Sequence, residues 1–176
     1  FVNKMDLEGR DGFDILDELE TKLSIKVQPL SWPISKGFSF KGVYKLYDKS
    51  INLFASNKTK VEENIVHIED LNDPILDELA GQYANELRQD VELISNVYDP
   101  FDVEAYKAGK LAPVFFGSAM NNFGVRELLE KFIEIAPTPR SRETETREVD
   151  PAEPKFSGFV FKIHANIDPR HRDRIA

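Results

Sequence analysis

A continuous apolar run over residues 111–116 is the feature that most restricts how this chain can fold. The run is Leu-Ala-Pro-Val-Phe-Phe, and such runs are typical of a parallel strand that is buried on both faces. Beyond Ser118, apolar side chains recur at helical spacing from Val125 to Ile133, and Pro137 ends that pattern. A buried strand followed by an amphipathic helix indicates an α/β fold with a parallel sheet.

The amino-terminal residues repeat this alternation of strand and helix. Phe1 and Val2 are expected to end a buried strand that breaks into the polar residues 3–6. A helix is predicted over residues 12–23, because Asp11 is a suitable N-cap and apolar side chains follow at spacings of three and four. Strand and helix therefore alternate at both ends of a longer middle region.

The middle region has a different periodicity. From Ile25 to Ile68 the pattern favours a small antiparallel sheet, with strand, turn and strand over residues 39–54. Asp73 and Pro74 then predict the start of one long helix over about residues 74–96. A short helix over residues 102–108 follows, stopped by Gly109. We interpret about residues 25–100 as an α+β subdomain inserted into the α/β fold.

The carboxyl-terminal part differs in composition. Residues 138–154 are polar and lack apolar periodicity, which is typical of an inter-domain linker. A new domain is expected to begin near Lys155, because Phe159, Phe161 and Ile163 alternate with their neighbours as in a β-strand. Its remaining strands are absent, and we interpret the chain as a fragment.

Composition excludes several classes of protein. With no cysteine there is neither a disulfide framework nor a thiolate metal site. The apolar runs are too short to span a bilayer, so no membrane association and a cytosolic location are expected. The net charge of −8 argues against extensive nucleic-acid binding, although residues 155–176 hold 5 Lys and Arg against 2 Asp and Glu. The three histidines show no metal-ligand pattern; they are His67, His164 and His171.

Two short polar segments follow predicted parallel strands and carry the chemical signal. They are Asn3-Lys4-Met5-Asp6 and Ser118-Ala119-Met120. In open α/β sheets, ligands bind beyond the carboxyl ends of the strands. The Asp6 carboxylate can accept from the ring N1–H and the exocyclic amine of guanine, a pair that adenine lacks. The sequence therefore predicts a guanine-binding site formed by these two segments.

The other residues of the two segments have complementary roles in this hypothesis. Lys4 can lay its aliphatic stem over the base, and Asn3 can tie the neighbouring loops together. Ser118 is expected to orient the carboxylate, and the Ala119 N–H to face the guanine carbonyl oxygen. Met120 is included as a neighbouring pocket residue.

The pair of motifs resembles the guanine-specificity elements of translational GTPases. The insertion between them is similar to that of elongation factor G and peptide chain release factor 3, and the order and spacing of residues 31–34, 40–44 and 113–125 resemble the release factor 3 family more closely. The resemblance covers essentially all 176 residues. It implies that residues 1–137 are the C-terminal part of a P-loop GTPase domain, and that residues 155–176 begin a β-barrel domain.

The resemblance also implies an activity for the whole protein. It would bind GTP or GDP with Mg²⁺, hydrolyse GTP on the ribosome in the cytoplasm, and promote departure and recycling of the codon-reading release factors during termination. The present residues contain no Gly-x-x-x-x-Gly-Lys-Ser/Thr phosphate loop, no switch aspartate and no catalytic histidine of the family. We therefore expect this fragment to hold no catalytic residue and no metal site, to lack GTPase activity, and to bind nucleotide feebly.

Two alternatives stay open at this point. The chain could belong to an elongation factor G relative, which continues through more domains after Ala176. It could also be an acidic interaction module that binds no nucleotide. A phosphate loop encoded upstream of Phe1 would separate the GTPases from such a module.

Two charged clusters each have two interpretations. The basic cluster near the end of the chain could contact ribosomal RNA phosphates, or its arginines could pair with Asp168 and Asp173. The acidic cluster is expected to form a solvated face, with a partner surface as the alternative. The basic residues are Arg170, His171, Arg172 and Arg174, and the acidic ones are Glu62, Glu63, Glu69, Asp70, Asp77 and Glu78.

Overall fold

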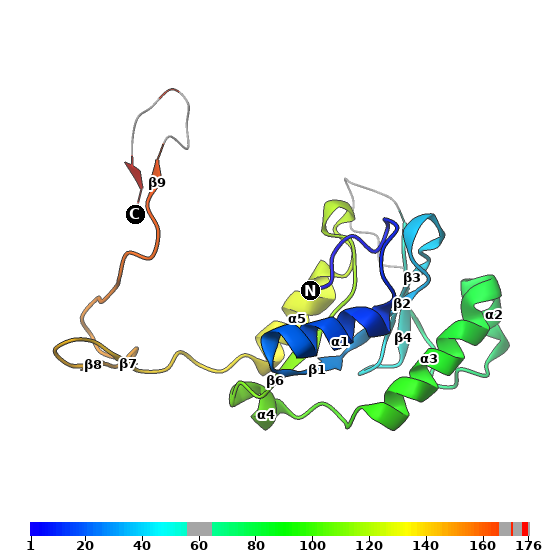
Figure 1. Cartoon of the computed structure of the whole chain (residues 1–176), viewed down its shortest axis with the longest axis horizontal. Helices are drawn as coiled ribbons and strands as arrows, with labels where there is room; N and C mark the ends of the chain where they lie inside the picture. Colours follow the sequence, from blue (N-terminus) through cyan, green and yellow to red (C-terminus); the bar gives the residue numbers. More distant parts are fainter. Residues whose placement is uncertain (56–64, 166–169, 171–173, 176) are drawn as a thin grey trace. The chain divides into compact units, whose positions relative to one another are not determined.

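The computed structural model describes residues 1–55, 65–165, 170 and 174–175. The chain divides into two compact units, Phe1–Ala136 and Pro137–Ala176. The first unit is a mixed α/β structure with a small parallel sheet and a four-stranded antiparallel sheet (Figure 1).

The parallel sheet lies where the continuous apolar run predicts a strand, but the expected burial on both faces is wrong for residues 111–113, which are half-buried. β6 (Leu111–Val114) pairs in parallel with β1 (Lys26–Pro29), and Val2 adds a parallel bridge to Phe116. The expected antiparallel sheet therefore does not begin at Ile25, because residues 26–29 belong to the parallel sheet. Val2 is only partly buried and Phe1 is 43% exposed, so the expectation of a buried strand end at these two residues is wrong.

The outer edge of β1 is protected against further strand pairing. The Val27 N–H donates to Glu20 Oε1 over 2.9 Å, while the Leu30 N–H faces β6 and donates to the Val114 carbonyl. Pro29, the next outward-facing residue, has no N–H to offer. A capped donor and a missing donor make this edge a poor template for another strand.

The antiparallel sheet has the strand order β2-β3-β4-β5. The predicted strand, turn and strand are present as β3 and β4, although β3 is shorter than expected and β4 begins and ends one residue earlier than expected. Trp32 lies opposite Tyr44, so both face the same side of the sheet, whereas Val43 and Asn52 are opposite each other and face the other side. The strands are β2 (Ser31–Ile34), β3 (Gly42–Lys45), β4 (Ser50–Leu53) and β5 (Ile65–His67).

Helix α1 (Gly12–Leu23) has the predicted bounds and the predicted cap. Asp11 Oδ1 accepts from the Phe13 N–H over 2.9 Å. The Phe13 ring packs on Trp32 with centroids 4.5 Å apart, and a Cβ added to Gly12 would lie 2.8 Å from the same indole. Glycine at position 12 therefore lets the helix approach Trp32 closely.

The single long helix predicted over residues 74–96 is wrong. The chain forms α2 (Pro74–Ala80), a 3-10 turn η2 (Gly81–Tyr83) and α3 (Ala84–Val97). Gly81 adopts φ 59°, a left-handed conformation that interrupts the helix and that glycine adopts without strain. The expected cap is present, since Asp73 Oδ1 accepts from the Ile75 N–H over 2.9 Å.

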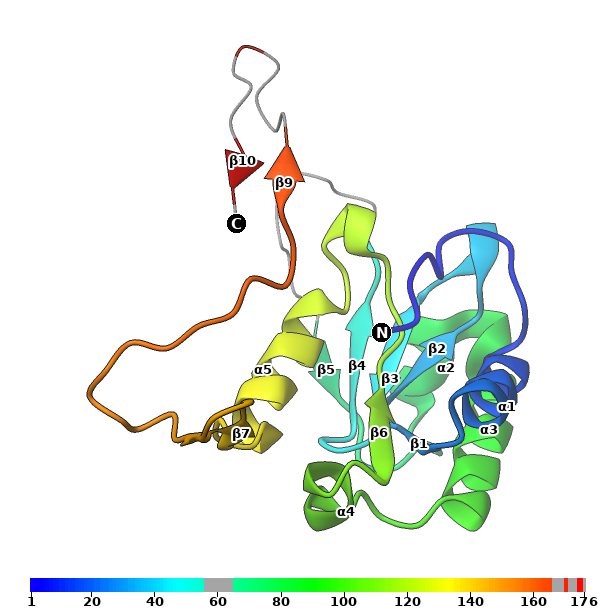
Figure 2. The ribbon, with the colours of Figure 1, turned by 60° about the vertical axis from the view of Figure 1, so that its left-hand side comes forward.

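The remaining helices follow their predicted positions. α4 (Val103–Lys107) is capped by Asp102, and Gly109 follows it with φ 73°. α5 (Val125–Ile135) ends before Pro137. In Figure 2, α5 lies on one side of the strands, and α1 and α3 lie on the other. The stripe predicted on α5 is largely uncovered, with Leu129, Phe132 and Ile133 exposed by 52%, 52% and 79%.

The second unit contains two short ladders. β7 (Arg142–Glu143) pairs with β8 (Glu148–Val149) inside the segment predicted as a linker, and β9 (His164–Ala165) pairs with β10 (Arg174–Ile175). The strand predicted at residues 159–163 is wrong: no strand forms there, and Phe159 and Phe161 are 83% and 86% exposed. Alternating side chains do not make a strand unless a neighbour pairs with the backbone.

Across the described parts of the chain, no helix combines the length and apolar character that crossing a membrane requires.

Asn52 and Glu127 form a buried polar contact between β4 and α5. Their exposed fractions are 4% and 6%, and Asn52 Nδ2 donates to Glu127 Oε1. We predict that Asn52→Ala lowers the free energy of unfolding by about 2–4 kcal/mol, because it leaves a carboxylate buried without this donor. Urea unfolding measures the change, and Asn96→Ala on the exposed surface of α3 is the control. Equal effects of the two substitutions would contradict the prediction.

Asp90 on α3 accepts from Trp32 Nε1 over 2.8 Å. Burial raises the pKa of this carboxyl, and the nearby charges of Glu86 and Asp11 raise it further, against the opposing effect of the Trp32 bond. Folding therefore favours the protonated form. The contribution of Asp90 to stability is fully present below the unfolded pKa, about 3.9, and is lost as the pH rises through the raised folded pKa.

We predict that Asp90→Asn, which keeps an acceptor for the indole but carries no charge, gains stability relative to the unmodified chain as the pH rises from about 4 to 7. Urea unfolding at several pH values, followed by the fluorescence of the single tryptophan, measures the difference. A difference that is constant with pH would show that Asp90 does not titrate differently on folding.

Candidate functional site

The two predicted motifs lie side by side, just beyond the parallel bridge between Val2 and Phe116. The Val2 N–H donates to the Phe115 carbonyl over 2.7 Å, and the Gly117 N–H donates to the Val2 carbonyl over 3.0 Å. Further along the first segment, the Met5 N–H donates to the Gly117 carbonyl over 3.0 Å. These backbone bonds place residues 3–6 directly beside residues 117–120.

Asn3 ties the two segments together with its side chain. Its Oδ1 accepts from the Ala119 N–H over 2.9 Å and from the Lys4 N–H over 2.8 Å. The tie expected of Asn3 is therefore present. It also occupies the Ala119 N–H, which the sequence hypothesis had directed at the guanine carbonyl oxygen, so in this structure that donor is engaged by the protein.

Asp6 is connected to Ser118 through a residue that the sequence analysis did not identify. Asn121 Nδ2 donates to Asp6 Oδ2 over 3.2 Å and to Ser118 Oγ over 2.9 Å. Within the described residues, Ser118 makes no direct hydrogen bond to the Asp6 carboxylate, and the two groups are connected through the Asn121 amide. The only signal for Asn121 in the sequence is its place in the same loop, three residues after Ser118.

The side chains of the site differ in exposure. Lys4 adopts φ 69° and is exposed, whereas Met5 beside it is buried in the core. Asp6 is half-buried and Ser118 is 1% exposed. Met120 is 71% exposed, and no contact ties it to the Asp6 carboxylate in the described residues. The Lys4 and Asp6 side chains and the exposed residues of the second loop are therefore accessible to a ligand, whereas Ser118 is buried.

The second loop depends on two glycines. It folds back so that the Ser118 N–H donates to the Phe123 carbonyl and the Phe123 N–H donates to the Ser118 carbonyl, over 3.0 and 2.9 Å. A Cβ on Gly117 would lie 2.3 Å from the Phe123 carbonyl oxygen, and one on Gly124 would lie 2.7 Å from the Phe116 carbonyl oxygen. Glycine at both positions permits this close return of the chain.

Residues that flank the antiparallel strands contact both loops. The Gly37 N–H, in the 3-10 turn η1 (Gly37–Ser39), donates to the Met5 carbonyl over 2.9 Å. Phe123 packs edge-on against Phe40 and Phe54, with centroids 5.6 and 5.3 Å apart. The first motif and the second loop are therefore each held by turn residues and strand-flanking residues that lie between them in the sequence.

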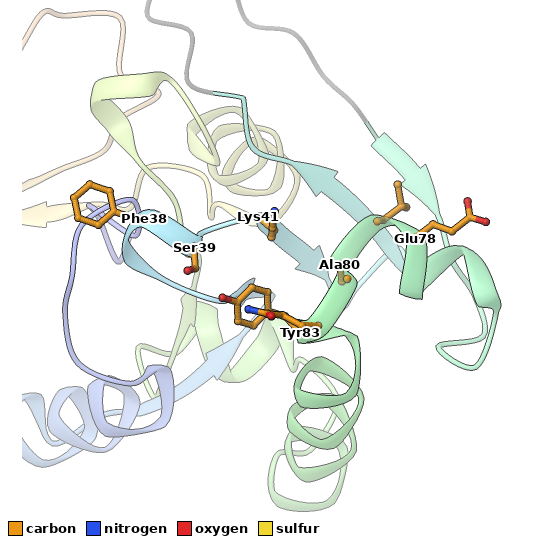
Figure 3. Close-up of a pocket in the computed structure, with 9 residues that line it drawn as sticks. Phe38, Ser39, Lys41, Glu78, Ala80 and Tyr83 are labelled. Atoms are coloured by element: carbon orange, nitrogen blue, oxygen red, sulfur yellow. The ribbon is translucent and has the colours of Figure 1, made fainter.

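A separate hollow of about 450 Å³ lies between η1 and the junction of α2 with η2. Figure 3 shows the Ser39 and Tyr83 hydroxyls directed toward one another, while Phe38 and Glu78 point away from them. A hydrogen bond with Ser39, followed by bonds with Gln82 and Ser35 and the charge of Lys41, lowers the pKa of Tyr83. These hydroxyls are used in joining the two turns, so the hollow is a weaker candidate than the paired loops.

The basic cluster and the acidic cluster lie only partly within the described residues. Of the basic cluster, Arg170 is exposed and has an interaction of its own, Arg174 belongs to β10, and His171 and Arg172 lie outside the described residues. Their expected partners Asp168 and Asp173, and the acidic residues Glu62 and Glu63, also lie outside them. The other acidic residues are exposed, as expected; they are Glu69, Asp70, Asp77 and Glu78. Among the described residues, no group of His, Cys, Asp and Glu could hold a metal ion.

No protein-family model matches the chain. Among solved structures, it is similar to the crystal structure of ttk003000868 from Thermus thermophilus, with 23% identity and a TM-score of 0.49. The match covers 78% of this chain but 22% of the Thermus chain, so the present chain spans about a fifth of that protein. The likeness is distant and assigns no activity to this chain.

We predict that Asn3→Ala accelerates amide hydrogen exchange at Ala119 by about tenfold or more and lowers the free energy of unfolding by about 1 kcal/mol, because a backbone donor loses its acceptor. NMR-detected exchange on the 176-residue chain measures the effect. Asn96→Ala is the matched control and should leave Ala119 unchanged. Unchanged exchange at Ala119 in Asn3→Ala would show that the tie does not persist in solution.

Proposed function

We propose that this chain carries the guanine-recognition half of the GTP site of a translational GTPase of the peptide chain release factor 3 type. The bond from the Ala119 N–H to Asn3 Oδ1 is the observation that carries the proposal, because it joins two motifs that lie 116 positions apart in the sequence. Both motifs directly follow the parallel bridge between Val2 and Phe116, near the carboxyl end of β6, and ligands bind beyond the carboxyl ends of the strands in open α/β sheets.

The carboxylate of Asp6 fits the role of base reader. Asn121 holds Oδ2, and Oδ1 receives no hydrogen bond from the described residues. The side chain is half-buried, so an incoming pair of N–H donors would meet a carboxylate that is partly desolvated yet still open. Charge-assisted bonds of this kind are shorter and stronger than neutral ones. The N1–H and the exocyclic amine of guanine are such a pair.

Lys4 and Asn3 complete the recognition half in this proposal. The exposed Lys4 side chain can cover one face of the base with its methylene groups while the ammonium stays hydrated. Asn3 keeps the two loops at a fixed separation through its bond to Ala119. The Ala119 N–H can reach the guanine carbonyl oxygen only if that bond lengthens, so base binding would shift the loop slightly.

The phosphate-binding half would lie elsewhere in the whole protein. The uncovered side chains of α5, Leu129, Phe132 and Ile133, agree with this proposal, since a complete P-loop GTPase domain offers further elements that could pack there. Phosphate positioning and Mg²⁺ would come from that half, and GTP hydrolysis would follow on the ribosome. The complete protein would then act in termination, promoting departure of the codon-reading release factors from the cytoplasmic ribosome.

Asp6→Asn in the complete protein tests the site directly. The amide replaces one carboxylate acceptor with a donor, so the guanine amine meets a donor in a partly desolvated pocket. We expect a loss of about 2–4 kcal/mol, or roughly 30- to 1000-fold in GTP affinity. Xanthine carries a carbonyl in place of the amine, so the preference should move toward XTP.

Competition binding of GTP, ATP and XTP to the unmodified protein and to Asp6→Asn measures both effects. Asp90→Asn is a control for the loss of a carboxylate outside the proposed site. If Asp6→Asn keeps its GTP affinity, or gains no affinity for XTP, then Asp6 is a structural carboxylate and the proposed guanine site is wrong.

A further inference from the structure

Asn121 occupies a rigid position in the second loop. It ends the 3-10 turn η3 (Ala119–Asn121), and its N–H donates to the Ser118 carbonyl over 3.1 Å. The next residue, Asn122, adopts φ 53°, which turns the chain back toward the Phe123 bridge. The backbone on both sides of Asn121 is thus fixed by hydrogen bonds, and its half-buried carboxamide starts from a defined place.

The carboxamide connects the interior of the loop to the carboxylate of the first motif. A primary amide has two N–H donors, and the Nδ2 of Asn121 lies within hydrogen-bond distance of two acceptors, Ser118 Oγ and Asp6 Oδ2. Because Ser118 is 1% exposed, Asn121 reaches the carboxylate from the protein side of the loop. The opposite oxygen, Oδ1, is the one left open.

We propose that Asn121 is a positioning residue for guanine specificity, which fixes the orientation of the Asp6 carboxylate so that both guanine donors find an acceptor. This inference rests on the proposed GTP site. A carboxylate that rotates freely can still accept from a single donor. It can accept from two adjacent donors at once only when the orientation of its plane is fixed. Asn121 supplies that constraint, and Ser118 supplies the buried anchor for it.

The orientation matters most for the exocyclic amine. Inosine nucleotides keep the ring N1–H but lack the amine, so they need one acceptor rather than two. Loss of the constraint should therefore weaken GTP binding more than ITP binding. A substitution that merely loosens the loop would weaken both to the same extent, and the ratio of the two affinities separates these cases.

The test uses the complete protein, with GTP and ITP as ligands. For Asn121→Ala we expect GTP affinity to fall roughly 10- to 150-fold, the effect of losing one hydrogen bond to a charged group. The fold-loss in ITP affinity should be about one third of the fold-loss in GTP affinity, because ITP lacks the amine that needs the second acceptor. Asn121→Asp should bind GTP more weakly still, because two carboxylates then face each other. Asn96→Ala and Asn96→Asp are the matched controls, with thermal unfolding of each variant as the check on folding.

Each outcome has a distinct meaning. If the unmodified protein binds GTP, ITP and ATP equally or not at all, the proposed function fails and this inference fails with it. If the unmodified protein selects GTP and Asn121→Ala binds it unchanged, the positioning role is wrong while the site stands. Equal losses for GTP and ITP would reduce Asn121 to a structural residue. Tighter GTP binding by Asn121→Ala would show instead that the amide competes with the base for Asp6.

Discussion

The indole of Trp32 joins elements that are remote from one another in the sequence. Its ring packs on Phe13 of α1 and edge-on against Phe116, with centroids 4.5 and 5.3 Å away, and its N–H donates to Asp90 of α3. The side chain is 2% exposed. Aromatic groups of this size dominate the energetics of a core, and a buried indole N–H needs an acceptor. Trp32 thus determines how both helices lie on the strands, and it supports the strand end from which the second loop departs.

The site depends on the inserted strands and on the residues that flank them, as well as on its own loops. Ser31, beside Trp32, accepts from the Phe116 N–H through its hydroxyl over 3.0 Å, where the parallel pairing has ended. Gly37 holds the Met5 carbonyl, and Phe40 and Phe54 hold Phe123. Asn52 holds Glu127 on α5, just beyond the same loop. These hydrogen bonds and ring contacts are short and largely buried. A change in the position of the antiparallel sheet would therefore alter the geometry of the paired loops.

The sequence predicted which two segments lie together, but it did not predict the hydrogen bonds between them. Asn3, Lys4, Asp6 and Ser118 could be selected because residue type and position after a buried strand carry the signal. Asn121 could not, since an asparagine in a loop is usually a turn residue, and its role depends on a donor reaching across to the other segment. The bond from the Ala119 N–H to Asn3 Oδ1 could not be predicted for the same reason. The fold determines which donors and acceptors lie within reach of a short side chain.

The sequence alone determined the features that depend on residues close together in the chain. Asp11 caps α1 and Asp102 caps α4 through bonds to residues two or three positions away. The apolar run over residues 111–116 contains the predicted strand, although residues 111–113 are only half-buried. Tertiary structure decided the rest. Gly81 broke a helix whose periodicity continued through it, and β1 joined the parallel sheet because Val114 and Glu20 supplied partners for its two edges. Residues 159–163 alternate like a strand yet form none, because a strand exists only when another backbone pairs with it.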